Sequence, residues 1–155
     1  CQNKGQLNMS YSKVLSNTAR GGGGGVYAYS GASVISENTN ISDNTAVSNH
    51  GGGLYVEEST STFTMRGGTL RKNIAKASSK YGGGMYCWDA RCSIDSAVVE
   101  ENEAFNGGGI CQSKGQLNMS YSKVLSNTAR SGGGGVYAYS GASIISENTK
   151  KSYMN

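Results

Sequence analysis

The chain repeats itself at two scales, and this self-similarity constrains its fold more than any other feature of the sequence. At the larger scale, residues 1–40 recur as residues 111–150, at an offset of 110 residues. The two copies differ at four positions, which are Asn3/Ser113, Gly21/Ser131, Val34/Ile144 and Asn40/Lys150. Such close agreement within one chain indicates a recent tandem duplication.

At the smaller scale, each repeat contains a glycine triplet followed by an apolar residue. The triplets are residues 23–25, 51–53, 82–84, 107–109 and 133–135, and the apolar residues after them are Val26, Leu54, Met85, Ile110 and Val136. Ahead of each triplet lies a second signature, an apolar residue followed three positions later by Asn and five positions later by Ala. Its asparagines are Asn17, Asn44, Asn73, Asn102 and Asn127. The triplets are 28, 31, 25 and 26 residues apart, so the larger unit holds four smaller ones.

A third short apolar segment with alternating character lies within each repeat, for example at residues 7–9, 63–65 and 117–119. Three short extended segments in each repeat of ~27 residues, bounded by Gly, Ser and Asn, are typical of a three-sided β-solenoid. We therefore predict an all-β fold, a right-handed parallel β-helix of about five coils of 25–31 residues. Because the chain begins at Cys1 with no signal-peptide pattern, we expect residues 1–155 to be a single segment of a larger repeat protein.

The asparagines have a clear role in this geometry. Coils of a β-solenoid lie about 4.8 Å apart, so equivalent residues contact each other along the axis. An Asn in a turn can then hydrogen-bond its counterparts in the coils above and below, and the five asparagines of the second signature would form one ladder. We expect the Ala two residues later to keep this turn tight and the glycines to let the chain bend sharply.

Aromatic residues follow the glycine triplets. If the apolar residue after each triplet points inward, the next position points outward and carries Tyr27, Tyr55, Tyr86, Cys111 and Tyr137. Two positions further on lie Tyr29, Glu57, Trp88, Ser113 and Tyr139. The alternation predicts a row of exposed rings on one face, a candidate contact surface for glycans or for a partner protein. The interpretation that we favour is that the stacked tyrosines stabilise strand pairing.

These signatures resemble the repeats of the polymorphic outer membrane protein family, in which a Gly-Gly-Ala-apolar motif alternates with a Phe-x-x-Asn motif. The first motif corresponds here to residues 51–54, and the second to residues 41–44, with Ile41 in place of Phe. The resemblance extends from Val14 to Val136. It implies a cell-surface or secreted β-helical protein with an adhesive or structural role, and it implies no catalytic residues.

The sequence offers little catalytic or ligand-binding chemistry, so we expect neither enzymatic activity nor a cofactor or metal. A polysaccharide lyase or hydrolase, which would depend on Asp89 or Asp95, is a distant alternative. His50, the only histidine, is expected to lie in a solvated turn. The net charge of +4 is spread thinly, so we predict no nucleic-acid partner, and no apolar run of ~20 residues predicts a membrane-spanning segment.

The four cysteines fall into two pairs. Cys87 and Cys92 occupy inward positions of one coil and are either a local disulfide, which fits an oxidising extracellular compartment, or two buried free thiols. Cys1 and Cys111 are equivalent residues four coils apart, about 19 Å, too far to be bridged to each other. They either pair between molecules or stay free.

Three N-glycosylation sequons begin at Asn8, Asn40 and Asn118, all at predicted outward positions, and would accept glycans in a eukaryotic host.

Neither end of the sequence has the features of a polar cap. At the C-terminal end, Lys151 and Met154 stand where Ile41 and Asn44 stand in the earlier copy. We therefore predict that the partners are further repeats or other copies of the chain, with glycans as a further candidate. The prediction for function is a non-enzymatic extracellular module of a surface adhesin, stalk or filament. The alternative is a glycan-binding module that uses the aromatic row.

Overall fold

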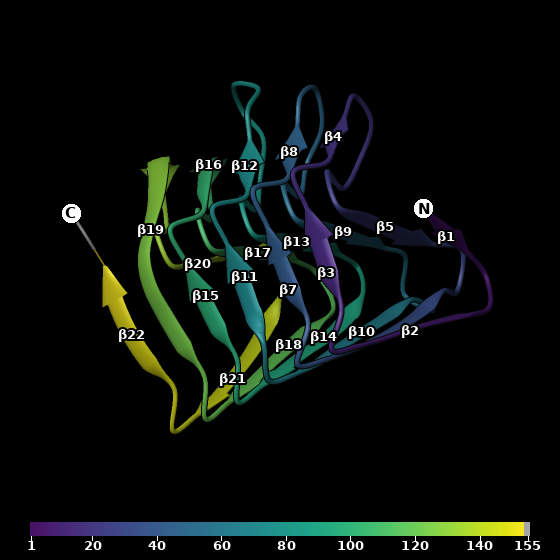
Figure 1. Cartoon of the computed structure of the whole chain (residues 1–155). Coiled ribbons are helices and arrows are strands. Elements are labelled where there is room, and N and C mark those ends of the chain that lie inside the picture. Colours follow the sequence, from purple (N-terminus) through teal and green to yellow (C-terminus); the bar gives the residue numbers. More distant parts are fainter. Residues whose placement is uncertain (154–155) are drawn as a thin grey trace.

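The protein is a β-solenoid of about five turns. The structure is a computed structural model that describes residues 1–153, and this part of the chain consists of strands and turns without a helix. Within the described residues all strand pairs are parallel, and most join equivalent residues of successive coils, as the repeat predicts. The register shifts between Ala104 and Asn106 and between Val124 and Asn127. Strands β1 and β22 lie at opposite ends of the stack (Figure 1).

Three sheets enclose the solenoid. The first sheet contains the strands after the glycine triplets, in the order β1 (Gln2–Asn3), β5 (Val26–Tyr29), β9 (Leu54–Glu57), β13 (Met85–Trp88), β17 (Ile110–Ser113) and β20 (Val136–Tyr139). The second sheet contains β2 (Gln6–Ser10), β6 (Ser33–Glu37), β10 (Thr62–Arg66), β14 (Arg91–Asp95), β18 (Gln116–Ser120) and β21 (Ser143–Glu147). The prediction of an all-β, three-sided architecture is confirmed.

The third sheet forms one side of the solenoid and continues into a second set of strands. It begins with β3 (Lys13–Leu15), β7 (Asn40–Ser42), β11 (Thr69–Arg71), β15 (Val98–Glu100) and β19 (Lys123–Gly132), and β22 (Lys150–Tyr153) pairs with β19. Through β19 it continues into β16 (Glu103–Asn106), β12 (Ile74–Ala75), β8 (Thr45–Ala46) and β4 (Thr18–Ala19). Four of the alanines predicted to tighten a turn therefore lie in short strands and the fifth, Ala129, lies in β19; Ala46 and Ala75 are buried.

Side chains between the three sheets form one continuous apolar core. Of the residues predicted to point inward after the triplets, Val26, Leu54, Met85 and Ile110 are buried, and Val136 packs against the core from the last coil. Phe63, Met65 and Leu70 fill the central coil and are fully buried. The alternation of apolar and polar residues thus gives the correct side for most strand residues, with exceptions such as the buried Ser36 and Gln112.

The three positions of a glycine triplet exclude larger residues for different reasons. In the triplet 51–53, Gly51 has a φ of 68°, a conformation that favours glycine. A Cβ on Gly52 would lie 2.5 Å from the backbone nitrogen of Ile74, and a Cβ on Gly53 would lie 3.0 Å from the side-chain carbon of Asn73. The second and third glycines therefore let the backbone approach the next coil closely.

Candidate functional site

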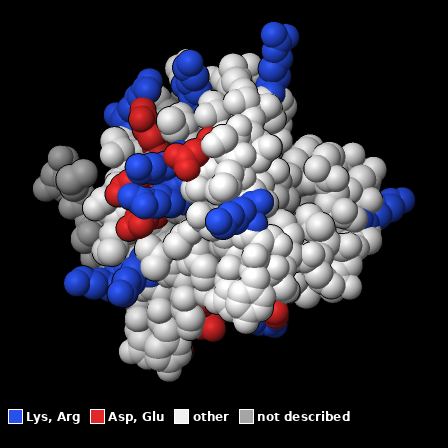
Figure 2. All heavy atoms as spheres, viewed as in Figure 1, with Lys and Arg blue, Asp and Glu red and all other residues white. Residues whose placement is uncertain are grey.

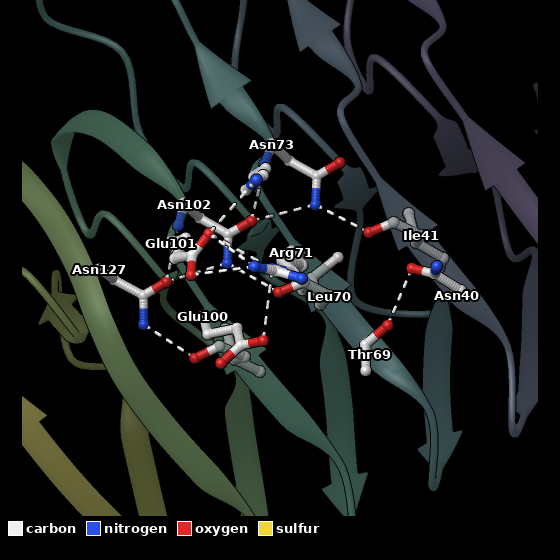
Figure 3. A network of polar contacts seen from close by, with 12 residues as sticks. Asn40, Ile41, Thr69, Leu70, Arg71, Asn73, Glu100, Glu101, Asn102 and Asn127 are labelled. Carbon is white, nitrogen blue, oxygen red and sulfur yellow. Dashed lines mark hydrogen bonds and ion pairs between the residues drawn. The ribbon is translucent and has the colours of Figure 1, made fainter.

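The asparagines of the second signature form a hydrogen-bonded ladder along the axis, and Figure 3 shows Asn73, Asn102 and Asn127 of this ladder. The side chain of Asn73 donates to the carboxamide oxygen of Asn102 at 3.0 Å and to the carbonyl of Ile41 at 2.9 Å. Its own oxygen accepts from the backbone and side chain of Asn44 at 3.0 and 2.9 Å. The same pattern continues from Asn17 at one end to Asn127 at the other. Asn44, Asn73, Asn102 and Asn127 are fully buried, so this ladder satisfies polar groups inside the stack.

Ion pairs also join neighbouring coils, on the outside. Arg71 lies 3.4 Å from Glu100 and 3.1 Å from Glu101, and the hydrogen bond from Arg71 lowers the pKa of Glu101. Arg130 pairs with Glu103 at 2.7 Å. Figure 2 shows that acidic side chains on this face lie among basic ones. Exposed pairs contribute at most about 1 kcal/mol each, so the ladder matters more for stability than these pairs.

A disulfide between Cys87 and Cys92 joins the first sheet to the second. Cys87 lies in β13 and Cys92 in β14, and the two-residue corner between these strands brings their Cα atoms to 6.8 Å. Both cysteines are part of the main core, so the bridge packs among apolar side chains.

Replacing Cys87 and Cys92 together by Ala should lower the free energy of unfolding by about 2 kcal/mol, because the short loop gains freedom in the unfolded state. The urea midpoint of the double variant measures this loss. A reducing agent should lower the midpoint of the wild type to a similar value and leave that of the variant unchanged. An equal midpoint for the variant and the oxidised wild type would contradict the prediction.

Aromatic side chains stack along the outer face of the first sheet. The ring centroids of Tyr27 and Tyr55 are 5.0 Å apart, and those of Tyr55 and Tyr86 are 5.2 Å apart. Cys111 follows in the same row, because it pairs in register with Tyr86 and Tyr137. Together they form a second apolar cluster, which we call the aromatic stack, outside the main core.

The predicted exposure of this row is wrong for its central members, since Tyr55 is 7% exposed and Tyr86 is 4% exposed. The rings of His50 and Tyr81 lie over them, with centroids 4.6 and 5.7 Å from that of Tyr86. Both residues precede a glycine triplet, where the chain returns from the third sheet to the first. Sequence reasoning missed Tyr81, although an aromatic ring at the same place in two successive repeats was a usable signal.

His50 connects the loops that cover the aromatic stack, which corrects its prediction as a solvated turn residue. The backbone N–H of Tyr81 donates to His50 Nδ1 at 3.0 Å. The N–H of Gly23 donates to the carbonyl of His50 at 3.1 Å, and the N–H of Gly51 donates to that of Tyr81 at 3.0 Å. Three successive loops are therefore hydrogen-bonded along the axis, and Nδ1 must be unprotonated to take part.

Protonation of His50 should weaken the fold. Burial, aided by the positive charge of Lys80, lowers the pKa of His50 to about 4, whereas the unfolded residue titrates near 6.5. Its contribution to stability is then complete above about pH 6.5 and is lost as the pH falls toward 4, by about 1 to 2 kcal/mol after allowance for partial exposure.

The control for this prediction is His50→Asn, which keeps an acceptor near the Nδ1 position but does not titrate. The melting temperature should be lower at pH 4.5 than at pH 7.5. This decrease should be about 3 to 6 °C larger in the wild type than in the variant. The same fall in both proteins would show that His50 does not couple stability to pH.

The burial of the stack also changes the ionisation of its members. Burial is the main cause that raises the pKa of Tyr55 and Tyr86, and in Tyr86 a hydrogen bond with Tyr139 at 2.8 Å adds to it. Burial likewise raises the pKa of the Cys111 thiol. Cys111 is fully buried and Cys1 is exposed, so of this pair only Cys1 is accessible for a bond to another molecule.

A second outward row of the first sheet is covered only in part, since Tyr139 stacks on Tyr81 with ring centroids 5.2 Å apart. It contains the last residue of each long strand, namely Tyr29, Glu57, Trp88, Ser113 and Tyr139. Trp88 is 37% exposed, whereas Tyr29, Glu57 and Tyr139 are half-buried and Ser113 is buried. Of the seven predicted contact residues, Trp88 is therefore the one that is most open to a ligand, and Tyr27 and Tyr137 are half-buried members of the stack.

No protein-family model, no curated protein and no solved structure matches the chain. Within residues 1–153, no pocket is found, and no three His, Cys, Asp or Glu side chains lie close enough to hold a metal ion. In the same part of the chain, no helix is long and apolar enough to cross a membrane. Met154, predicted to replace a ladder asparagine, lies outside the described residues.

The sequon asparagines differ in their surroundings. Asn8 and Asn118 lie in the middle of β2 and β18 with exposed side chains, as predicted. Asn40 is half-buried, and its side-chain oxygen accepts a hydrogen bond from the Thr69 hydroxyl at 2.8 Å. A transferase would reach the first two more easily than Asn40.

Proposed function

We propose that the chain is a non-enzymatic, extracellular structural or adhesive module, a rigid rod within a surface protein, stalk or filament. This proposal is supported by the direction of the contacts within the molecule, which run along the solenoid axis. Strand pairing, the asparagine ladder and the ion pairs all join one coil to the next. A molecule bonded in this way resists bending along its axis and presents long, regular faces to its surroundings.

The disulfide supports an extracellular location. A bond between Cys87 and Cys92 persists in oxidising compartments and is rare in a reducing cytosol. The resemblance of the glycine and asparagine signatures to those of the polymorphic outer membrane proteins supports the same location.

The placement of the acidic residues supports a role without catalysis. Asp89 precedes β14 and Asp95 ends it, so the length of the strand, about 13 Å, separates them. Paired carboxylates that hydrolyse glycosidic bonds lie within about 9.5 Å of each other. Asp95 instead accepts a hydrogen bond from Ser120 at 2.7 Å, which ties it to the next coil. This arrangement weighs against the lyase or hydrolase alternative.

The partners that we propose are further repeats or other copies of the chain, because parallel pairing of coils is the contact that the molecule uses throughout. Electron microscopy of natively purified protein tests this. Long fibres with a ~4.8 Å axial repeat are expected. Discrete short rods would contradict self-assembly.

The location is tested on intact cells that produce the protein. An amine-reactive label that cannot cross membranes should modify exposed lysines such as Lys13 and Lys123 without lysis. Protein taken directly from these cells and denatured, so that the buried Cys111 reacts, should also show two cysteines that resist alkylation until they are reduced. Labelling that requires lysis, together with four free thiols, would overturn the proposal.

A further inference from the structure

The second outward row of the first sheet alternates aromatic rings with polar side chains, and Trp88 is its exposed member. Along the axis it reads Tyr29, Glu57, Trp88, Ser113 and Tyr139, one residue from each coil. Neighbouring strands are about 4.8 Å apart, so the rings recur at about 9.6 Å, at every second coil. This spacing is a property of the fold, because each of these residues ends the equivalent strand of its coil.

The rings of this row are held in place before any ligand arrives. Tyr29 stacks on Tyr27 with centroids 4.8 Å apart, and Tyr139 stacks on Tyr137 at 5.6 Å. Trp88 lies between them along the axis with more than a third of its surface exposed. Aromatic side chains that are already ordered lose little entropy on binding.

The polar residue between the first two rings is also prepared for a ligand. Glu57 accepts a hydrogen bond from the Tyr27 hydroxyl at one carboxylate oxygen, which fixes its orientation. A half-buried carboxylate between two rings can accept hydrogen bonds from hydroxyl groups that lie along the row.

We propose that this row binds an extended β-1,4-linked polysaccharide that runs along the solenoid axis. Successive sugars in such a polymer are turned over, so the same face recurs at every second sugar, a repeat similar in length to two coils. The apolar sugar faces would stack on Tyr29 and Trp88, and the hydroxyls between them would donate to Glu57. The alternation of ring and polar group therefore matches this class of polymer better than it matches a small molecule or a peptide.

This inference rests on the proposed function only in that a surface location brings the rod to its ligand. Binding is measured with the purified chain of residues 1–155, using cellohexaose and chitohexaose in titration calorimetry and retention on insoluble cellulose and chitin. Failure of binding would leave the extracellular proposal intact, and failure of surface labelling would leave the binding result intact.

The variant Trp88→Ala should weaken binding of the retained probe about tenfold or more, because one stacking surface is lost. Glu57→Gln should weaken it less, since an amide oxygen still accepts hydrogen bonds. The matched control is Tyr121→Ala, which removes a 62% exposed ring from a different corner of the solenoid and should bind like the wild type. Urea midpoints close to that of the wild type will show that each variant is folded.

Two results would overturn the inference. One is wild-type protein that binds neither hexasaccharide and is not retained on either polymer. The other is binding that Trp88→Ala and Tyr121→Ala weaken equally, because a general loss of exposed aromatic surface would then explain the effect.

Discussion

Replacing Gly52 by Ala should destabilise the protein by more than about 4 kcal/mol or prevent folding. A Cβ at this position would lie 2.5 Å from two backbone atoms of Ile74 and closer still to the carbonyl oxygen of Gly83 in the next coil. Backbone atoms cannot move aside as a flexible side chain can, so two coils would have to separate. The urea midpoint and the far-ultraviolet circular dichroism of the variant measure this effect.

The chain contains its own control for Gly52. A methyl group added at Gly21 would have no atom within 4 Å, and the second copy of the repeat has Ser131 in its place. Gly21→Ala should therefore change the free energy of unfolding by about 0.5 kcal/mol or less. Because Gly52→Ala is expected to fold poorly, Gly53→Ala provides a milder test, since its Cβ would lie 2.7 Å from the Gly84 carbonyl oxygen and 2.8 Å from a side-chain carbon of Leu70, longer than the contacts at Gly52. Wild-type stability in both Gly52→Ala and Gly53→Ala would show that the coils are not packed as closely as described.

Removing a central rung of the asparagine ladder should have the second largest effect. In Asn73→Ala, the backbone and side-chain N–H groups of Asn44 lose their acceptor, and the carbonyl of Ile41 loses a donor. These groups lie inside the stack, where water cannot replace the lost partner. The expected loss is about 3 to 5 kcal/mol, measured as a lower urea midpoint at an unchanged slope.

Asn17→Ala is the matched control, because Asn17 donates to Asn44 in the same way but lies exposed at the end of the ladder. Water can replace its hydrogen bonds, so the expected loss is about 1 kcal/mol or less. If Asn73→Ala and Asn17→Ala lower the free energy of unfolding equally, burial does not increase the contribution of the ladder to stability.

The prediction of a solenoid succeeded because the sequence signatures recur with the period of the coils. Identical signatures at regular spacing place identical residues above one another, so the stacking of Asn44 on Asn73 follows from the repeat alone. The inward and outward sides of each strand follow from the two-residue period of an extended chain. Neither inference depends on how different segments of one repeat pack against each other.

The exposure of the aromatic row could not be predicted in the same way. Alternation shows that Tyr55 and Tyr86 point away from the core, but it does not show what lies over them. That depends on the path of the loops that carry His50 and Tyr81 back across the sheet. The lengths of these loops vary from repeat to repeat, and so the regular spacing says least about them.

The disulfide could be predicted from the sequence only in part. Alternation places Cys87 and Cys92 on the inside, and a bond and two free thiols were equally compatible with that placement. The structure decides between them through the corner after β13, which brings the two Cα atoms to 6.8 Å.

The sequence by itself therefore determined the architecture, the ladder and the side of most strand residues, because these depend on local periods that repetition along the axis reinforces. Only the tertiary structure decided which outward residues are buried and which remain open. Burial depends on the loops between strands and on the close approach that residues such as Gly52 permit. For that reason the exposed position of Trp88, and with it the candidate ligand, emerged from the folded molecule.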